Sequence, residues 1–102
     1  MSLEDLVGEM TNQADKLKEL NHSVLFDLGD DGKILLDATG GNVKITPNPD
    51  DDDAETTLTL SSENLVKLMQ GDLNPMVAFT LGKLKVSGSK GIALKLSSLL
   101  DK

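Results

Sequence analysis

The chain has 102 residues and a mass of 10.9 kDa, which is the size of one domain spanning residues 1–102. Seventeen acidic and ten basic residues give a net charge of −7, so repulsion from phosphate argues against nucleic acid as a partner. The absence of cysteine excludes disulfides, zinc–thiolate sites, iron–sulfur clusters and thiol catalysis. With only Phe26 and Phe79 as aromatic residues, aliphatic side chains and methionine must fill the core.

Neither a membrane span nor a targeting signal is evident in the chain. No stretch approaches the roughly 18 apolar residues that a transmembrane helix needs. The first residues lack the basic start and apolar run of a signal peptide. The ending Leu100-Asp101-Lys102 differs from the Ser-Lys-Leu peroxisomal address. These features, with the absence of cysteine, predict a cytoplasmic location.

The first twenty residues predict a helix. Apolar residues recur in steps of three and four from Leu3 to Leu20, which draws an apolar stripe along one face. Ser2 can cap the start, with Asp5 three residues later in a variant of the capping box. Asn21 is expected to end this helix.

Four strands joined by short turns are predicted next, because apolar and polar residues alternate. Glycine and aspartate or asparagine separate the first three, and Pro47 and Pro49 are expected to end the third, since proline cannot donate to a ladder. The short turns favour antiparallel pairing. The predicted strands cover residues 23–28, 33–39, 43–46 and 55–60.

Two short helices follow. Ser61 or Ser62 can cap the first, and Gly71 stands where a helix-ending glycine is expected. The pair Asn74-Pro75 supplies a cap and a first-turn proline for the second, which should end near Gly82.

The chain then predicts a fifth strand over residues 83–87, a break over 88–91, and a final amphipathic helix over 92–100. The break superficially suggests a phosphate loop, but five residues separate Gly82 from Gly88 and the lysine follows Ser89, which does not match that motif. We interpret it as a tight turn, although amides at a helix start could hold an anion weakly.

Polar residues offer little chemistry. The run Asp50-Asp51-Asp52-Asp53 fails as a calcium loop, because Glu55 stands where glycine is required and Ser61 where glutamate is required, so it is interpreted as a solvated loop. The single histidine, His22, could act as a general base, but Ser23 beside it should point to the opposite face of a strand. Asp37 is expected to face solvent or bond a neighbour. A small hydrolase using His22 is therefore the least favoured function, and no metal site or cofactor is predicted.

The remaining signal is a set of apolar residues on the short helices. Periodicity alone assigns them to the core, whereas small helices over one sheet could also part to admit an apolar guest. These residues are Leu65, Leu68, Met69, Met76, Phe79, Leu96, Leu99 and Leu100.

Residues 71–88, GDLNPMVAFTLGKLKVSG, resemble the signature of the sterol carrier protein 2 family. That signature is a glycine, a proline, an alanine–aromatic pair and then Gly-Lys-aliphatic-basic-aliphatic-x-Gly, followed by an amphipathic helix that ends in leucines. The order of predicted elements also matches this family over almost the whole chain. The resemblance implies an α+β fold, with a five-stranded, mostly antiparallel sheet covered on one face by helices and an apolar tunnel between the layers.

The resemblance implies a non-catalytic protein that binds or transfers lipid, needs no cofactor and makes transient membrane contact. The scarcity of aromatic residues favours a linear acyl chain over a sterol. The alternative is an accessory protein that presents an apolar substrate, such as a prenyl-quinone precursor, to a partner enzyme. We expect a monomer whose ligand contacts Leu65, Leu68, Met69, Met76, Phe79, Leu84, Leu96, Leu99 and Leu100.

Overall fold

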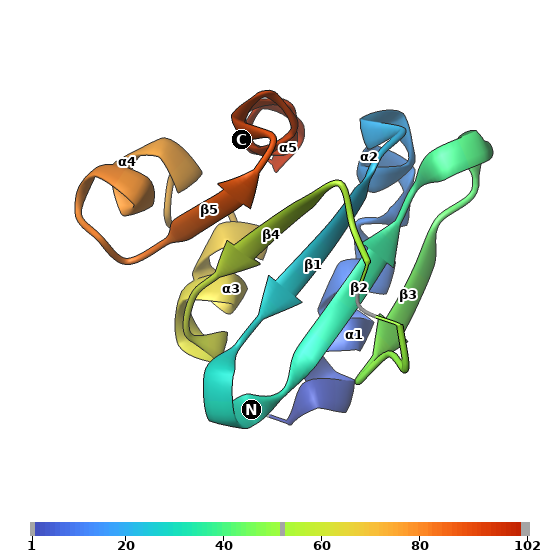
Figure 1. Ribbon diagram of the computed structural model, residues 1–102, viewed down its shortest axis with the longest axis horizontal. Coiled ribbons are helices and arrows are strands. Elements are labelled where there is room, and N and C mark those ends of the chain that lie inside the picture. Colours follow the sequence, from blue (N-terminus) through green and yellow to red (C-terminus); the bar gives the residue numbers. More distant parts are fainter. Residues whose placement is uncertain (1, 52, 101–102) are drawn as a thin grey trace.

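A computed structural model describes residues 2–51 and 53–100 of the chain as an α+β structure, with a five-stranded sheet and helices (Figure 1). The helices are α1 (Leu3–Asn12), α2 (Ala14–Leu17), α3 (Ser62–Met69), α4 (Pro75–Thr80) and α5 (Lys90–Leu100). The strands are β1 (Ser23–Asp27), β2 (Lys33–Asp37), β3 (Lys44–Pro47), β4 (Thr56–Thr59) and β5 (Lys85–Gly88). Short 3₁₀ turns occupy Lys18–Leu20, Gly29–Asp31 and Thr39–Gly41.

The sheet has the strand order β3-β2-β1-β4-β5, which confirms the mostly antiparallel prediction. Only the central pair, β1 with β4, runs parallel. In this pair Phe26 lies opposite Leu58, and on its other side Phe26 lies opposite Ile34 of β2. The general preference for antiparallel pairing after short turns is therefore wrong for β4, which joins the sheet beside β1 instead of beside β3.

The core lies between the sheet and helices α1, α2, α3 and α5. Figure 1 shows α1, α2 and α3 behind the sheet, with α4 beside β5 at one end. Phe26 is fully buried at the centre of the sheet, and the aliphatic residues of the helices pack around it. The largest buried side chains of the helical layer are Leu6, Met10, Leu17, Leu20, Leu65, Leu68, Met69 and Leu96.

The first helical region is broken, contrary to the single helix predicted to Leu20. Gln13 leaves helical geometry with φ −102° and ψ 13°, and the Thr11 hydroxyl donates to the Val7 carbonyl, a bond that bends helices. The break allows the Gln13 side-chain amide to donate to the carbonyl of Met69 at the end of α3. The predicted ends are confirmed, since Ser2 and Asp5 form a capping box and Asn21 adopts the left-handed conformation.

The short helix α4 is closed at both ends by local hydrogen bonds. The Asn74 Oδ1 accepts from the amides of Met76 and Val77 at 2.8 and 3.3 Å. At the other end the amides of Gly82 and Lys83 donate to the carbonyls of Phe79 and Ala78, which is a Schellman motif. Both sequence signals for this helix are confirmed.

Helix α5 begins at Lys90, two residues earlier than predicted. The Ser89 hydroxyl accepts a hydrogen bond from the Ile92 amide at 3.3 Å, so Ser89 caps the helix and Lys90 and Gly91 form its first turn. None of the helices within the described residues is long and apolar enough to cross a membrane.

The end of β5 requires glycine at position 88. Gly88 has φ +97°, and a Cβ there would lie 2.7 Å from the Glu55 carbonyl oxygen and 3.1 Å from the Thr56 Cα. This close approach lets the buried Thr56 hydroxyl bond the carbonyls of Ser87 and Ser89, at 3.0 and 3.1 Å. Gly88 therefore holds β5 and the start of α5 against β4.

We expect Gly88→Ala to be more destabilising than Gly40→Ala. Both glycines have positive φ, which costs an L-residue about 1–2 kcal/mol, but a Cβ on Gly40 meets no atom within 4 Å. The contact with backbone atoms should add about 1–3 kcal/mol for Gly88→Ala. Urea unfolding of both variants measures the difference, and equal losses would show that β4 and β5 shift to accept the methyl group.

Candidate apolar ligand site

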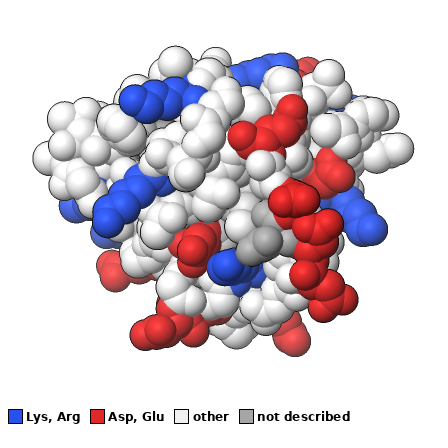
Figure 2. All heavy atoms as spheres, in the orientation of Figure 1, with Lys and Arg blue, Asp and Glu red and all other residues white. Residues whose placement is uncertain are grey.

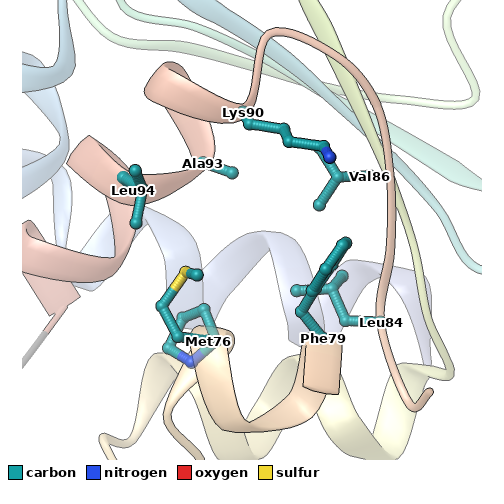
Figure 3. A pocket seen from close by; sticks show the side chains of 8 residues that line it. Met76, Phe79, Leu84, Val86, Lys90, Ala93 and Leu94 are labelled. Atoms are coloured by element: carbon teal, nitrogen blue, oxygen red, sulfur yellow. The ribbon is translucent and has the colours of Figure 1, made fainter. Parts of the chain in front are cut away.

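A cavity of about 120 Å³ lies between α4, β5 and α5, inside the end of the domain that carries α4. Figure 3 shows Met76 projecting from α4 toward Leu94 of α5, and Phe79 projecting from α4 toward Val86 and Lys90. The full lining is Pro75, Met76, Phe79, Leu84, Val86, Lys90, Ala93 and Leu94. All of these side chains except Lys90 are apolar.

The cavity has a closed floor and an open rim. Leu84 and Ala93 are only 2% and 7% exposed and form the floor. Met76, Phe79 and Leu94 are 42%, 39% and 51% exposed and form the rim. The cavity therefore offers an apolar end that is shielded from water and a mouth that is not, which suits a chain-like apolar group.

Among the described residues that line the cavity, Lys90 is the only charged one. Its Nζ lies 5.7 Å from the centroid of the Phe79 ring, within the range of a cation–π contact (Figure 3). The side chain of Lys90 is thus positioned over the mouth, where an ammonium can meet a carboxylate or phosphate carried by a ligand that enters with its apolar end first.

A second, smaller cavity of about 40 Å³ lies on the other side of Pro75. It is enclosed between the end of α3 and α5, and Leu68, Leu73 and Leu100 contribute to its lining. Pro75 lines both cavities and is itself buried. The first turn of α4 therefore separates the apolar cavity from a smaller cavity whose lining also includes the polar residues Asn74 and Ser97.

The predicted contact residues fall into three groups. Met76, Phe79 and Leu84 line the larger cavity, and Leu68 and Leu100 line the smaller one. The remaining four contribute to the core between helices and sheet, where Leu65, Met69 and Leu96 are buried and Leu99 is half-buried. Ligand contact by the nine residues stays a prediction, as does the internal tunnel. The larger cavity lies below the roughly 300–1,000 Å³ of typical ligand pockets.

Five lining residues were not among the predicted contacts: Pro75, Val86, Lys90, Ala93 and Leu94. Val86 alternates with charged residues along β5, and Ala93 is a small residue in an apolar helix, so neither stands out from the core. Leu94 could have been noticed in the sequence, because it is a large apolar residue that lies off the buried stripe of α5. In the structure it is 51% exposed. An unpartnered leucine of this kind marks either a surface or a mouth.

The only histidine belongs to a hydrogen-bonded cluster between β1 and β4, on the side of β4 that is opposite to β5. The carboxylate of Glu55 accepts from the Ser23 amide at 2.9 Å and lies 3.1 Å from the His22 Nδ1. The Glu55 amide in turn donates to the Ser23 hydroxyl at 3.0 Å. The Ser23 hydroxyl is thus an acceptor for backbone, and the cluster joins the starts of β1 and β4, which is a structural role.

Two carboxyl groups near these strand ends are held in the charged form. The pKa of Glu55 lies below its usual range because the carboxylate accepts the Ser23 amide, with a smaller effect of His22. The pKa of Asp37 is lowered by hydrogen bonds from the hydroxyl and amide of Thr39. Asp37 therefore bonds a neighbour, which confirms that expectation.

We expect Glu55→Gln to lower stability at neutral pH but not in acid. A folded-state pKa below the unfolded value contributes stability above about pH 4.3, and this contribution is lost as pH falls through the folded pKa. Glutamine keeps an oxygen for the Ser23 amide but removes the charge. Denaturation midpoints should differ from wild type at pH 7 and converge near pH 3.

The matched control is Glu63→Gln, whose side chain is 80% exposed beside Lys67. A loss of stability in Glu55→Gln that persisted at pH 3 would show that the glutamine side-chain amide, and not the missing charge, weakens the contact with Ser23.

The acidic run behaves as the sequence indicated. Asp50, Asp51 and Asp53 are exposed, and Asp51 Oδ1 accepts from the Asp53 amide at 3.0 Å, whereas Asp52 lies outside the described residues. Within residues 2–51 and 53–100, no three acidic or histidine side chains gather as metal ligands would.

Comparison with known proteins identifies the class. The model of the SCP-2 sterol transfer family matches residues 3–101, and the chain belongs to this family. Sterol carrier protein 2 from Bos taurus is 38% identical over 71 residues, which cover 70% of this chain and 13% of the bovine protein. The chain thus spans about one eighth of that relative's length.

Solved structures agree with the fold. Sterol carrier protein 2 from Yarrowia lipolytica, in its apo form, has a TM-score of 0.70 at 25% identity, over 94% of this chain and 84% of that one. Palmitated SCP2L2 from Aedes aegypti has a TM-score of 0.68 at 15% identity, over 100% and 96%. The UbiJ-SCP2 ubiquinone synthesis protein has a TM-score of 0.64 at 18% identity, over 90% and 74%.

Proposed function

We propose that this domain binds a linear acyl chain non-covalently, with the apolar end in the cavity between α4, β5 and α5. The observation that carries the proposal is this cavity, whose floor and walls are apolar and whose mouth is open. Membership of a sterol transfer family supports a lipid as the ligand, and the palmitated relative from Aedes aegypti supports an acyl chain. No catalytic step is required for binding or release.

A long guest needs more room than the cavity offers, and α4 can supply it. This helix contributes only two buried residues, Pro75 and Ala78, while its other side chains lie at the surface. An outward movement of α4 uncovers Pro75 and Ala78 and takes Pro75 out of the wall between the two cavities. The joined space would then run from Phe79 to Leu100 and form the expected tunnel.

The shape of the site favours a chain over a sterol. The mouth is bordered by flexible side chains, and Phe79 is the only aromatic ring in the lining. A rigid ring system needs a wide pre-formed pocket, whereas a methylene chain can enter a narrow space in steps as methionine and leucine side chains change rotamer. Lys90 can pair with the carboxylate of a fatty acid at the rim.

A ligand that binds only the folded protein raises its stability, and an apolar group that fills the cavity of about 120 Å³ removes apolar surface from water. We therefore expect lipid extracts of the freshly purified protein to contain acyl lipid by mass spectrometry, and added fatty acid to raise the melting temperature of delipidated protein. Extracts without lipid, together with an unchanged melting temperature, would contradict the proposal.

Filling the cavity should abolish binding. Ala93→Leu adds three carbon atoms on the cavity floor, so we expect a folded protein whose melting temperature no longer responds to fatty acid. Ser98→Leu adds a leucine to an exposed position of the same helix and should keep the full response. If fatty acid stabilised the Ala93→Leu protein as much as it stabilises wild type, the ligand would have to bind outside this cavity.

The second candidate function is presentation of an apolar substrate to a partner enzyme. The fold similarity to the UbiJ-SCP2 ubiquinone synthesis protein and the exposed apolar side chains beside the cavity mouth favour it. The same extraction separates the two functions by the guest, since a prenyl-quinone precursor in place of acyl lipid would support presentation.

A further inference from the structure

The mouth of the larger cavity differs in chemistry between its two ends. At one end Met76 of α4 points toward Leu94 of α5, and both side chains are apolar (Figure 3). At the other end Phe79 of α4 points toward Lys90, whose Nζ lies 5.7 Å from the centroid of the phenyl ring. One end of the mouth therefore offers only apolar contacts, whereas the other end offers a positive charge.

Helix α5 places Lys90 at the start of a row of cavity-lining residues. Ala93 and Leu94 follow Lys90 by three and four residues, so the three side chains share one face of the helix. Further along α5, Ser97 and Leu100 line the smaller cavity. At a rise of 1.5 Å per residue, the row extends roughly 15 Å from Lys90 to Leu100. An alkyl chain that occupied both spaces would lie along α5, with one of its ends beside Lys90.

The ammonium group of Lys90 has no carboxylate partner among the described residues. The segment 73–100, which contains α4, β5 and α5, has no acidic residue at all. The carboxylate of Glu55, which precedes β4, is already held by the Ser23 amide at 2.9 Å. The ring of Phe79 attracts the ammonium but leaves its charge uncompensated, so an anion carried by a ligand can pair with it.

The surroundings of the mouth favour an anion in spite of the net charge of −7. Of the 17 acidic residues, only Asp101 follows Asp72. Figure 2 shows the separation, with blue mainly at the left and top and red mainly at the right and bottom. Charges are screened beyond about 8 Å at physiological salt, and the molecule measures 32 × 27 × 25 Å, so acidic side chains on the far side act weakly at Lys90. Three further exposed lysines of this segment do not line the cavity: Lys83, Lys85 and Lys95.

We propose that Lys90 makes the site selective for alkyl chains that end in an anionic oxygen headgroup, either a carboxylate or a phosphate. The headgroup lies at Lys90, and the chain runs along α5 toward Leu100. Phe79 is a positioning residue, because its ring holds the ammonium at the mouth. This inference rests on the function proposed above, and it adds which end of the ligand is recognised and by which side chain.

The test compares three ligands that share a chain and differ in the headgroup: decanoate, decyl phosphate and decanol. Each is titrated into the delipidated full chain by isothermal titration calorimetry. We expect Lys90→Gln to weaken at least one of the two anionic ligands roughly fivefold, the upper end for an exposed ion pair, and to leave decanol unchanged. The anion that loses more identifies the headgroup. The difference between wild type and Lys90→Gln should shrink as salt increases, because the charges at the mouth are screened.

Three variants separate the contact from general effects of charge. Lys95→Gln makes the same change in net charge on the same helix, at an exposed position outside the cavity lining, and should bind all three ligands as wild type does. Lys90→Arg keeps the positive charge and should keep the affinity for the anionic ligands. Phe79→Leu keeps an apolar lining but removes the ring, so it should lower the ratio of anion affinity to decanol affinity.

The outcomes distinguish this inference from the proposed function. Equal losses in Lys90→Gln and Lys95→Gln, or equal losses of Lys90→Gln for all three ligands, would overturn headgroup selection by Lys90 while binding in the cavity stands. An unchanged affinity ratio in Phe79→Leu would overturn the positioning role of Phe79. A wild-type protein that binds none of the three ligands would contradict the proposed function and this inference together.

Discussion

Because β1 and β4 pair in parallel at the centre of the sheet, the chain must return from the carboxyl end of β1 to the amino end of β4. It does so by building β2 and β3 on one side, which leaves the other side of β4 to the last third of the chain. The hydrogen bonds of this pair and the burial of Phe26 between Ile34 and Leu58 thus divide the domain. In one part, helices cover β1 to β3. In the other part, at β5, the helical layer covers the sheet less completely.

The incomplete helical cover at β5 explains why the cavity lies where it does. Beside β5, the six residues of α4 cover an area that a longer helix would fill, and its end is closed by its own Schellman motif instead of by packing. The cavity therefore does not lie within the densely packed core. It lies where α4 is too short to complete the helical layer over the sheet.

Sequence patterns predicted those features that depend on neighbours along the chain. The caps at Ser2 and Asn74 were evident because a cap needs only the next two or three residues. The break at Gln13 was not, since its partner is the carbonyl of Met69, 56 residues away. For the site, apolar character identified Met76 and Phe79. It could not separate Leu65 in the core from Val86 at the cavity, because alternation gives a face without saying what covers it.

The outer edge of the sheet at β3 carries a consequence for behaviour at high concentration. Pro47 lies opposite Ile34 as the last residue of β3, and the Asn48 amide that follows it donates inward to the Lys33 carbonyl at 2.7 Å. The main-chain nitrogen of Pro47 therefore points away from β2, and it carries no hydrogen to donate to an incoming strand. A second chain that paired with this edge would lack a hydrogen bond at Pro47, so the proline weakens edge-to-edge pairing at β3.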